Sequence, residues 1–200
     1  MITQISFEYR MGMFRGTDDF KNSLKESFNV HERPIWMPAA GGSFEMWFEI
    51  FVNTSLIDFL KGAFIGGAAY DIVKHAVFKP FVDSLGELEK ANEYPLEIQK
   101  YAFFFEDTKI IIYGLATNFT SIFSAIFSEL YNTYDLLSSS SGTSNIHEIR
   151  IPVDPESGRN EWWIGPEEIG PYLTYWGISI DFGVDYFIWD VQNKQMISNQ

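Results

Sequence analysis

The sequence predicts a single α+β domain spanning residues 1–200, in which an antiparallel or mixed β-sheet packs against two main helices. Runs with strand character lie towards both ends of the chain, and the longest runs with helical spacing lie between them. A chain of this length buries most of its apolar surface in one core. Aromatic residues make up 18% of it, so that core is expected to be bulky.

The N-terminal quarter is predicted to contain two strands and a short helix. Apolar residues alternate along residues 2–9, which indicates a strand. Thr17, Asp18 and Asp19 are N-cap candidates for a helix that carries Phe20, Leu24 and Phe28 at four-residue spacing. Residues 31–43 contain two prolines and a Gly-Gly pair, which favour a loop. Residues 44–52 alternate Glu45 and Glu49 with bulky apolar neighbours and are predicted to form the second strand.

The two main helices are predicted at residues 55–79, with a continuation to residue 92, and at residues 118–137. Ser55 and Asp58 form a possible capping box at the start of the first helix, and Pro80 forces a kink or a stop. The second helix carries eight apolar residues at helical spacing. Between the helices, residues 101–113 are β-branched or aromatic on both sides of a polar break, which indicates a hairpin of two buried strands.

The C-terminal third is predicted to be a flexible loop followed by strands. The Ser-rich tract at residues 138–145 has nothing to bury and marks a possible subdomain boundary. Residues 146–153 alternate as a strand. Residues 173–180 and 184–191 are expected to pair as a hairpin around Asp181-Phe182-Gly183.

The charge balance restricts the classes of partner. Fourteen Lys and Arg against 27 Asp and Glu leave a net charge of −13, which repels phosphates and anionic membranes, so neither nucleic acid nor a membrane is an expected partner. The chain has no Cys, which removes disulfides, thiolate metal sites and cysteine nucleophiles. The first residues lack the pattern of a secretory signal, so a cytoplasmic location is expected.

The stretch GAFIGGAA at residues 62–69 resembles a phosphate-binding loop only in its glycine spacing. Ala68 and Ala69 stand where that loop needs Lys and a hydroxyl, and flanking charges leave too few apolar residues for a membrane span. Small residues one helical turn apart instead allow close approach of another backbone. The sequence therefore predicts a helix-packing or homo-oligomer face at Gly62, Gly66 and Gly67.

No catalytic, metal or cofactor motif is found. The chain lacks His-Glu-x-x-His and Gly-x-Ser-x-Gly. His-Glu occurs at His31-Glu32 and at His147-Glu148, and the two pairs form a metal or acid–base site only if they converge in space. We expect no cofactor and no metal.

The C-terminal region combines aromatic residues with acids. From residue 160 onward, Trp and Tyr side chains alternate with six carboxylates against one Lys. Exposed aromatics rimmed by carboxylates suit an interface with a basic protein, or a cationic or sugar ligand; buried aromatics with a solvated acidic face are the structural alternative. The predicted binding residues are Trp162, Trp163, Glu167, Glu168, Tyr175, Asp181 and Asp185.

These observations favour a non-enzymatic protein-binding module whose acidic C-terminal surface engages a basic protein. An immunity or inhibitor protein, or an accessory protein of a bacterial or phage conflict system, has this profile of a small, acidic, cysteine-free chain. The alternatives are a small-ligand or carbohydrate-binding protein and a carboxylate-dependent hydrolase. Self-association through the glycine face is a further possibility.

Overall fold

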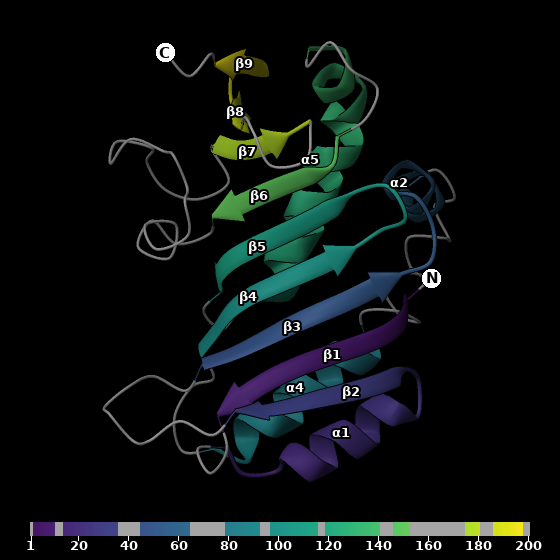
Figure 1. Ribbon diagram of the computed structural model, residues 1–200, viewed down its shortest axis with the longest axis vertical. Helices are drawn as coiled ribbons and strands as arrows, with labels where there is room; N and C mark the ends of the chain where they lie inside the picture. The colour runs from purple at the N-terminus through teal and green to yellow at the C-terminus, as the bar shows by residue number, and fades with distance from the viewer. Residues whose placement is uncertain are drawn as a thin grey trace.

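The computed structural model describes residues 2–10, 14–35, 45–64, 79–92, 97–115, 119–140, 146–152, 175–180 and 186–197 (Figure 1). Within these residues the helices are α1 (Thr17–Lys25), α2 (Leu56–Phe64), α4 (Lys79–Lys90) and α5 (Phe119–Ser140). The strands are β1 (Ile2–Arg10), β2 (Asn29–Ile35), β3 (Glu45–Val52), β4 (Glu97–Phe104), β5 (Lys109–Leu115), β6 (Glu148–Pro152), β7 (Tyr175–Ser179), β8 (Tyr186–Asp190) and β9 (Gln195–Ile197).

All nine strands form one mixed sheet, in the order β2-β1-β3-β4-β5-β6-β7-β8-β9. Three neighbouring pairs are parallel: β1 with β2, β3 with β4, and β5 with β6. In each of these pairs a helical segment lies between the two strands in the chain, as a parallel connection requires. The other neighbours are antiparallel. The α+β class and the mixed sheet are therefore confirmed.

The four described helices lie on one face of the sheet, and none of them covers the opposite face (Figure 1). Aromatic rings show which face each helix contacts: Phe20 of α1 and Phe81 of α4 both pack on Phe48 of β3. Farther along the sheet, Phe127 of α5 packs on Phe103 of β4. Phe59 of α2 packs on Phe127 and so joins the same layer. The result is a two-layer structure with one open sheet face.

Phe48 is the centre of the core beneath α1 and α4. Its side chain is fully buried. Its ring centroid lies 5.1 Å from that of Phe81, 5.3 Å from that of Tyr101 and 6.2 Å from that of Phe7. Complete burial of Tyr101 raises the pKa of its phenol well above the ordinary value, and the nearby Glu89 carboxylate adds to the shift. This cluster joins α1, α4 and three central strands.

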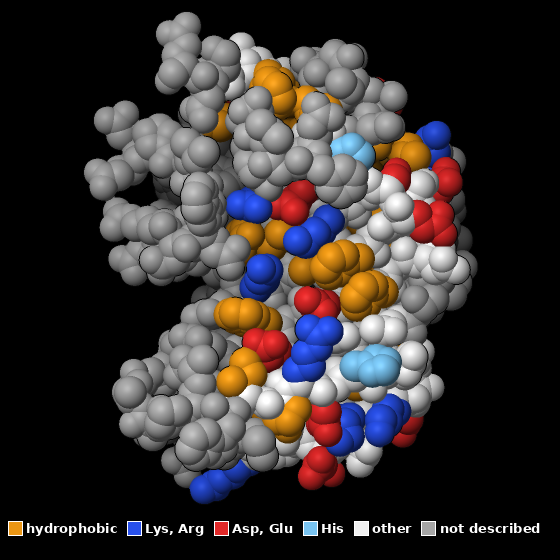
Figure 2. All heavy atoms as spheres, in the orientation of Figure 1, with side chains coloured by type: hydrophobic (Ala, Val, Ile, Leu, Met, Phe, Trp, Pro, Cys, Tyr) orange, Lys and Arg blue, Asp and Glu red, His pale blue; other side chains and the backbone are white. Residues whose placement is uncertain are grey.

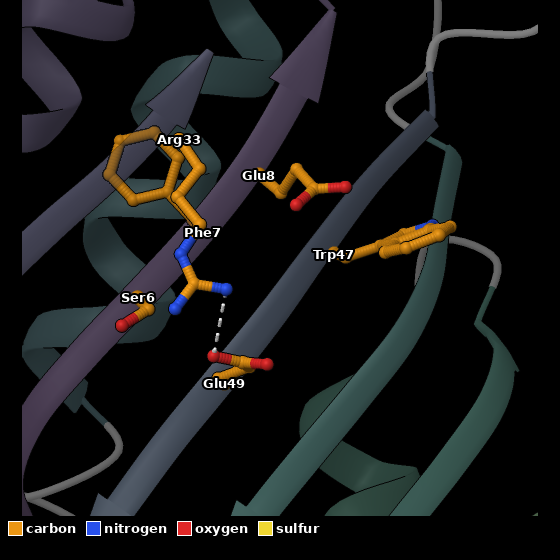
Figure 3. Close-up of a pocket in the computed structure, with 6 residues that line it drawn as sticks. All are labelled: Ser6, Phe7, Glu8, Arg33, Trp47 and Glu49. Atoms are coloured by element: carbon orange, nitrogen blue, oxygen red, sulfur yellow. Dashed lines mark ion pairs between the residues drawn. The ribbon is translucent and has the colours of Figure 1, made fainter. Parts of the chain in front are cut away.

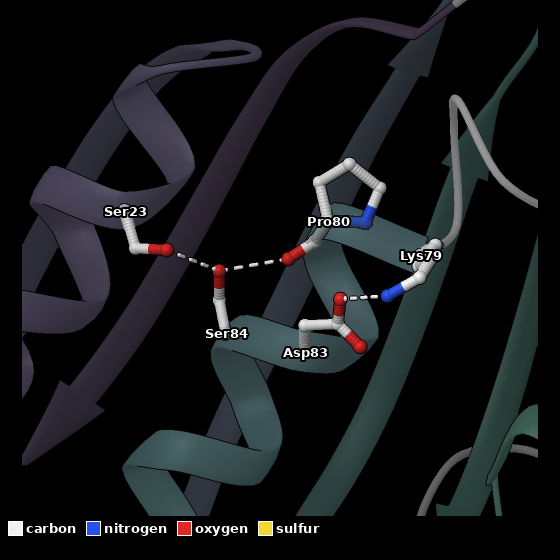
Figure 4. Close-up of polar contacts among 5 residues, drawn as sticks. All are labelled: Ser23, Lys79, Pro80, Asp83 and Ser84. Carbon is white, nitrogen blue, oxygen red and sulfur yellow. Dashed lines mark hydrogen bonds and ion pairs between the residues drawn. The ribbon is translucent and has the colours of Figure 1, made fainter.

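A polar contact joins α1 and α4 beside the aromatic core (Figure 4). The buried Ser84 hydroxyl donates to the Pro80 carbonyl at 2.7 Å. Its single proton is used there, so Ser23 donates in the 2.8 Å contact between the Ser23 and Ser84 hydroxyl oxygens. The nearby ion pair of Lys79 and Asp83 is about half exposed on both sides, and pairs of this kind contribute less than about 1 kcal/mol. Ser84 is thus the polar side chain that positions the two helices.

Most elements expected from the sequence are confirmed. The structure has the first two predicted strands, the helix starting at Leu56, the helix after Pro80, the central hairpin and the C-terminal hairpin. Asp58 donates its backbone N–H to the Ser55 hydroxyl at 3.2 Å, as expected for a cap. The predicted helix at residues 118–137 corresponds to α5. The predicted helical course through residues 65–78 and the turn at residues 181–183 lie outside the described residues.

Four details of the predictions are wrong. The N-cap of α1 is Gly16, in the left-handed conformation at φ 78°, and no side chain caps the helix. Residues 31–35, predicted as a loop, belong to β2, where Pro34 is tolerated because β2 is an edge strand. Helix α5 continues through residues 138–140 of the Ser-rich tract. Strand β9 was not expected; it has three residues, too few for a recognisable alternation.

Asp190 ends β8 and holds the turn that leads to β9. One of its carboxylate oxygens accepts the backbone N–H groups of Gln192 and Asn193, each at 3.0 Å. The other accepts the side-chain N–H of Asn193 at 2.7 Å. These hydrogen bonds stabilise the ionised carboxylate, the side-chain bond from Asn193 most strongly, and so hold the pKa of Asp190 below its ordinary value.

We expect Asp190 to make stability depend on pH in the acid range. A depressed pKa in the folded protein stabilises it above the unfolded-state pKa of about 3.9, and this contribution is lost as the pH falls through the folded-state pKa. The free energy of unfolding of the wild type should therefore exceed that of Asp190→Asn at pH 6, and the difference should shrink below pH 4. Urea titrations of both proteins at several pH values measure it. A difference that stays constant down to pH 3 would contradict the assignment.

Candidate functional site

Most residues of the predicted C-terminal binding surface lie outside the described residues. These are Trp162, Trp163, Glu167, Glu168, Asp181 and Asp185. Tyr175 is the first residue of β7, where its backbone lies opposite Asp190. The predicted surface therefore stays a prediction.

The predicted glycine face is described at one position only. Gly62 lies in α2 and is exposed, and apart from its chain neighbours and its own helix backbone no described heavy atom lies within 4 Å of an added Cβ. Gly66 and Gly67 fall outside them. Close packing or self-association at this face stays a prediction as well.

The two His-Glu pairs do not converge. His31 lies on the edge strand β2, and His147 directly precedes β6. Five strand spacings separate these strands in the sheet, which at about 4.8 Å each gives about 24 Å. Within the described residues, no group of three or more His, Asp or Glu side chains could hold a metal ion. No described helix is long and apolar enough to cross a membrane.

The candidate site lies on the open face of the sheet, which we define as the side of β1–β6 away from the described helices (Figure 2). Along β3, Phe48 and Ile50 point into the core, so the alternating Trp47, Glu49 and Phe51 lie on the open face. Figure 2 shows hydrophobic, basic and acidic side chains interspersed over this face. Its described charged residues are Glu8, Arg33, Glu49, Lys100, Lys109, Glu148 and Arg150.

An apolar cluster underlies the middle of the open face. Ala102, Ile111 and Tyr113 of the central hairpin are buried together. Phe104 packs against them and stacks on Phe51, with ring centroids 4.8 Å apart and planes within 10°. The two stacked rings are only partly buried. Offset stacking of this kind stabilises neighbouring strands by about 0.5–1.5 kcal/mol, so the cluster gives the face a rigid base.

Basic side chains lie over the aromatic rings of the open face. The Lys100 ammonium is 5.8 Å from the ring centre of Trp47 and 5.7 Å from that of Tyr113. The Lys109 ammonium is 5.4 Å from the Phe104 ring centre and 3.4 Å from a carboxylate oxygen of Glu148. These distances suit cation–π attraction. The chain's own lysines therefore already use the ring faces of Trp47, Tyr113 and Phe104.

A β-bulge places Lys100 next to Trp47. Met46 pairs with Ile98, but the next residue of β3, Trp47, pairs with Lys100, so Gln99 has no partner on β3. The extra residue returns Tyr101 to the core and leaves Lys100 on the open face. Without the bulge, strict alternation from Ile98 would turn Lys100 towards the helices.

Trp47 forms one wall of a shallow depression between β1, β2 and β3 (Figure 3). The side chain of Trp47 is 40% exposed. Arg33 reaches across β1 from the edge strand, and its Nη1 lies 3.7 Å from Oε2 of Glu49. The depression is open to solvent and encloses only about 20 Å³, about the space that one water molecule needs. Its lining residues are Ser6, Phe7, Glu8, Arg33, Trp47 and Glu49.

The sequence contained a signal for this site. Glu45, Trp47 and Glu49 alternate with core residues, so a large aromatic ring shares the solvent side of its strand with carboxylates. This alternation predicted the strand correctly. The exposed aromatic residues of a binding surface, however, were predicted in the C-terminal region and not on this strand. Arg33 could not be added, because its strand was predicted as a loop.

Comparison with protein families, with curated proteins and with solved structures finds no match to this chain. The described residues define the class of protein: a two-layer α+β protein with helices on one face of a mixed sheet and an open opposite face.

Proposed function

We propose that this chain is a protein-binding protein of the cytoplasm that recognises a basic partner, and that the open face of the sheet is part of its recognition surface. The observation that carries the proposal is Trp47, a large aromatic side chain that is 40% exposed on the face opposite the described helices. Tryptophan is enriched among the residues that dominate binding energy, especially where polar groups surround it. Glu8 and Lys100, its cross-strand neighbours, provide that polar surround.

The shape of the open face supports a protein partner. A broad sheet with stacked rings and one shallow depression offers an extended contact area rather than an enclosed cavity. The rigid apolar base keeps the exposed rings in position, which reduces the entropy lost on binding. These features suit a macromolecular surface better than a small ligand.

Charge supports a basic partner. The whole chain carries −13, and such a field speeds the encounter with a positively charged protein. On the open face, Arg33 is paired with Glu49, while Lys109 and Arg150 both contact Glu148. The described charged residues of the face, four basic and three acidic, sum to +1, so the face does not itself supply the acidic charge. We propose that Glu167, Glu168 and Asp185 supply the charge that complements a basic partner. An immunity, inhibitor or conflict-system accessory protein is the biological role we propose on these grounds.

Truncation of Trp47 is expected to weaken capture of the partner. Loss of an interface tryptophan commonly costs about 2 kcal/mol or more, which lowers affinity about 30-fold. Affinity capture from lysate with the tagged full chain, followed by quantitative mass spectrometry, identifies proteins enriched by the wild type. Binding of those proteins to wild type and Trp47→Ala is then measured with purified components.

The matched control is Leu136→Ala, which removes an exposed apolar side chain from α5, on the other side of the molecule from the open face. It should leave binding unchanged. If Trp47→Ala binds as tightly as Leu136→Ala, the open face is not the recognition surface. Charge reversal at Glu167, Glu168 and Asp185 tests the acidic contribution separately, and a binding constant with unaltered salt dependence would remove it from the proposal.

A further inference from the structure

We infer that the depression beside Trp47 receives one Lys or Arg side chain of the partner. The inference rests on the proposed function and specifies how the basic partner is recognised. Its basis is the combination in Figure 3: an exposed indole, two carboxylates, and a guanidinium held by only one of them.

The indole supplies the first attraction for a cation. The Lys100 ammonium already lies 5.8 Å from the ring centre of Trp47, on the β4 side. Glu8 is the cross-strand neighbour on the opposite, β1 side, where the depression opens. Attraction between a cation and an indole contributes about 0.5–1 kcal/mol at exposed sites and about 2 when water is excluded. A partner that covers the face would exclude water in this way.

The carboxylates supply the second attraction. Glu8 and Glu49 line the depression from adjacent strands, and among its described lining residues Arg33 is the one cation. The lining therefore carries a net charge of −1, which favours a cation over an anion. The depression is shallow and open, so a cationic side chain would lie across its carboxylates and the exposed indole, with no need of an enclosed cavity.

Arg33 acts as an internal competitor in this arrangement. Its side chain is 61% exposed and its guanidinium lies 3.7 Å from Glu49, in a loose contact. Exposed pairs of this kind contribute about 0–1 kcal/mol, so a partner side chain can displace Arg33 at little cost. Removal of Arg33 should then strengthen binding of an external cation, whereas neutralisation of Glu49 should weaken it. A surface that attracts the partner through its overall acidity alone would respond in the same directions, but it would respond equally to loss of a carboxylate far from the depression. A control carboxylate change outside the depression therefore separates the two explanations.

The test uses N-acetyl-L-arginine methylamide as the probe and two-dimensional NMR of the six Trp indole N–H groups. The Trp47 signal is the one that disappears in Trp47→Phe. We expect the arginine probe to shift this signal, with an apparent Kd about threefold lower in Arg33→Ala and at least threefold higher in Glu49→Gln. Glu106→Gln, an exposed carboxylate change in the β4–β5 turn, is the matched control and should leave Kd unchanged. N-acetyl-L-glutamine methylamide controls for contacts that need no charge.

Each outcome is decisive for the inference. An equal response to the neutral probe, or an Arg33→Ala variant that binds the arginine probe no more tightly than the wild type, would overturn it. Unchanged signals of the other indoles confirm that each variant is folded. If the probe fails but Trp47→Ala still loses the partner, the proposed function stands without this site. If the probe binds but partner capture ignores Trp47, the proposed function fails.

Discussion

Phe48→Ala is expected to lower the free energy of unfolding by about 3–5 kcal/mol, the largest effect of any change considered for this protein. Phe-to-Ala changes in a close-packed core remove buried apolar area and leave a cavity whose walls relax only partly. Phe48 has no exposed surface. The rings of Phe7, Phe81 and Tyr101 pack against it. The Phe20 ring of α1 also packs edge-on against Phe48, with ring centroids 6.1 Å apart. The change therefore loosens two helices and two neighbouring strands at once.

The same strand provides a matched control. Phe51 lies three residues farther along β3, on the open face, and stacks on the ring of Phe104. Phe51→Ala removes the same atoms from a partly exposed position, so we expect a loss of only about 1 kcal/mol. Denaturant unfolding of both variants measures the difference. Equal losses would show that helix-side packing does not dominate the stability of the sheet.

Phe48 also links the stability of the fold to the candidate site. It lies between Trp47 and Glu49 along β3, and its burial determines that both neighbours point to the open face. A one-residue slip of this strand would bury the site residues and expose Phe48. The core ring therefore helps to hold the depression in its observed register.

The elements that could be predicted from the sequence are those whose packing depends on neighbours in the chain. Helix α5 buries Ile126, Phe127, Leu130 and Leu137, which share a stripe at helical spacing. Strand β2 could not be predicted, because its residues are mostly polar and it contains Pro34. It forms by parallel pairing with β1, a contact that brings together residues 25 apart in the chain. The local pattern of polar and apolar residues therefore cannot predict this pairing.

The candidate site likewise depends in part on local sequence and in part on pairing between distant strands. The alternation of Glu45, Trp47 and Glu49 is local and shows that one side of β3 meets solvent. The neighbours of Trp47 in the sheet come from distant parts of the chain. Glu8 belongs to β1, and Lys100 of β4 lies beside Trp47 only because Gln99 forms a bulge. Strand order and a single extra residue thus determine which charges surround the indole. Neither is visible in the periodicity of the sequence.

Phe127→Ala is expected to have the second-largest effect, about 3–4 kcal/mol, through a different part of the core. The Phe127 ring lies 5.5 Å from that of Phe59 in α2 and 5.4 Å from that of Phe103 in β4. It therefore fills the space where α2 and α5 meet the sheet. Loss of the ring removes both aromatic contacts and leaves a cavity between three elements.

Helix α2 should respond most to the Phe127→Ala change. The described helix has nine residues, and helices this short are not stable alone in water. The Asp107 carboxylate still accepts the backbone N–H of Leu56 at 2.8 Å and holds its first turn, so the C-terminal part of α2 should lose protection first. Hydrogen exchange should accelerate at residues 59–64 more than in β3. Leu136→Ala, an exposed change on α5, the helix that carries Phe127, should cost about 0.5 kcal/mol or less. Uniform acceleration across the sheet would instead show that α2 and α5 unfold together with the central strands as one unit.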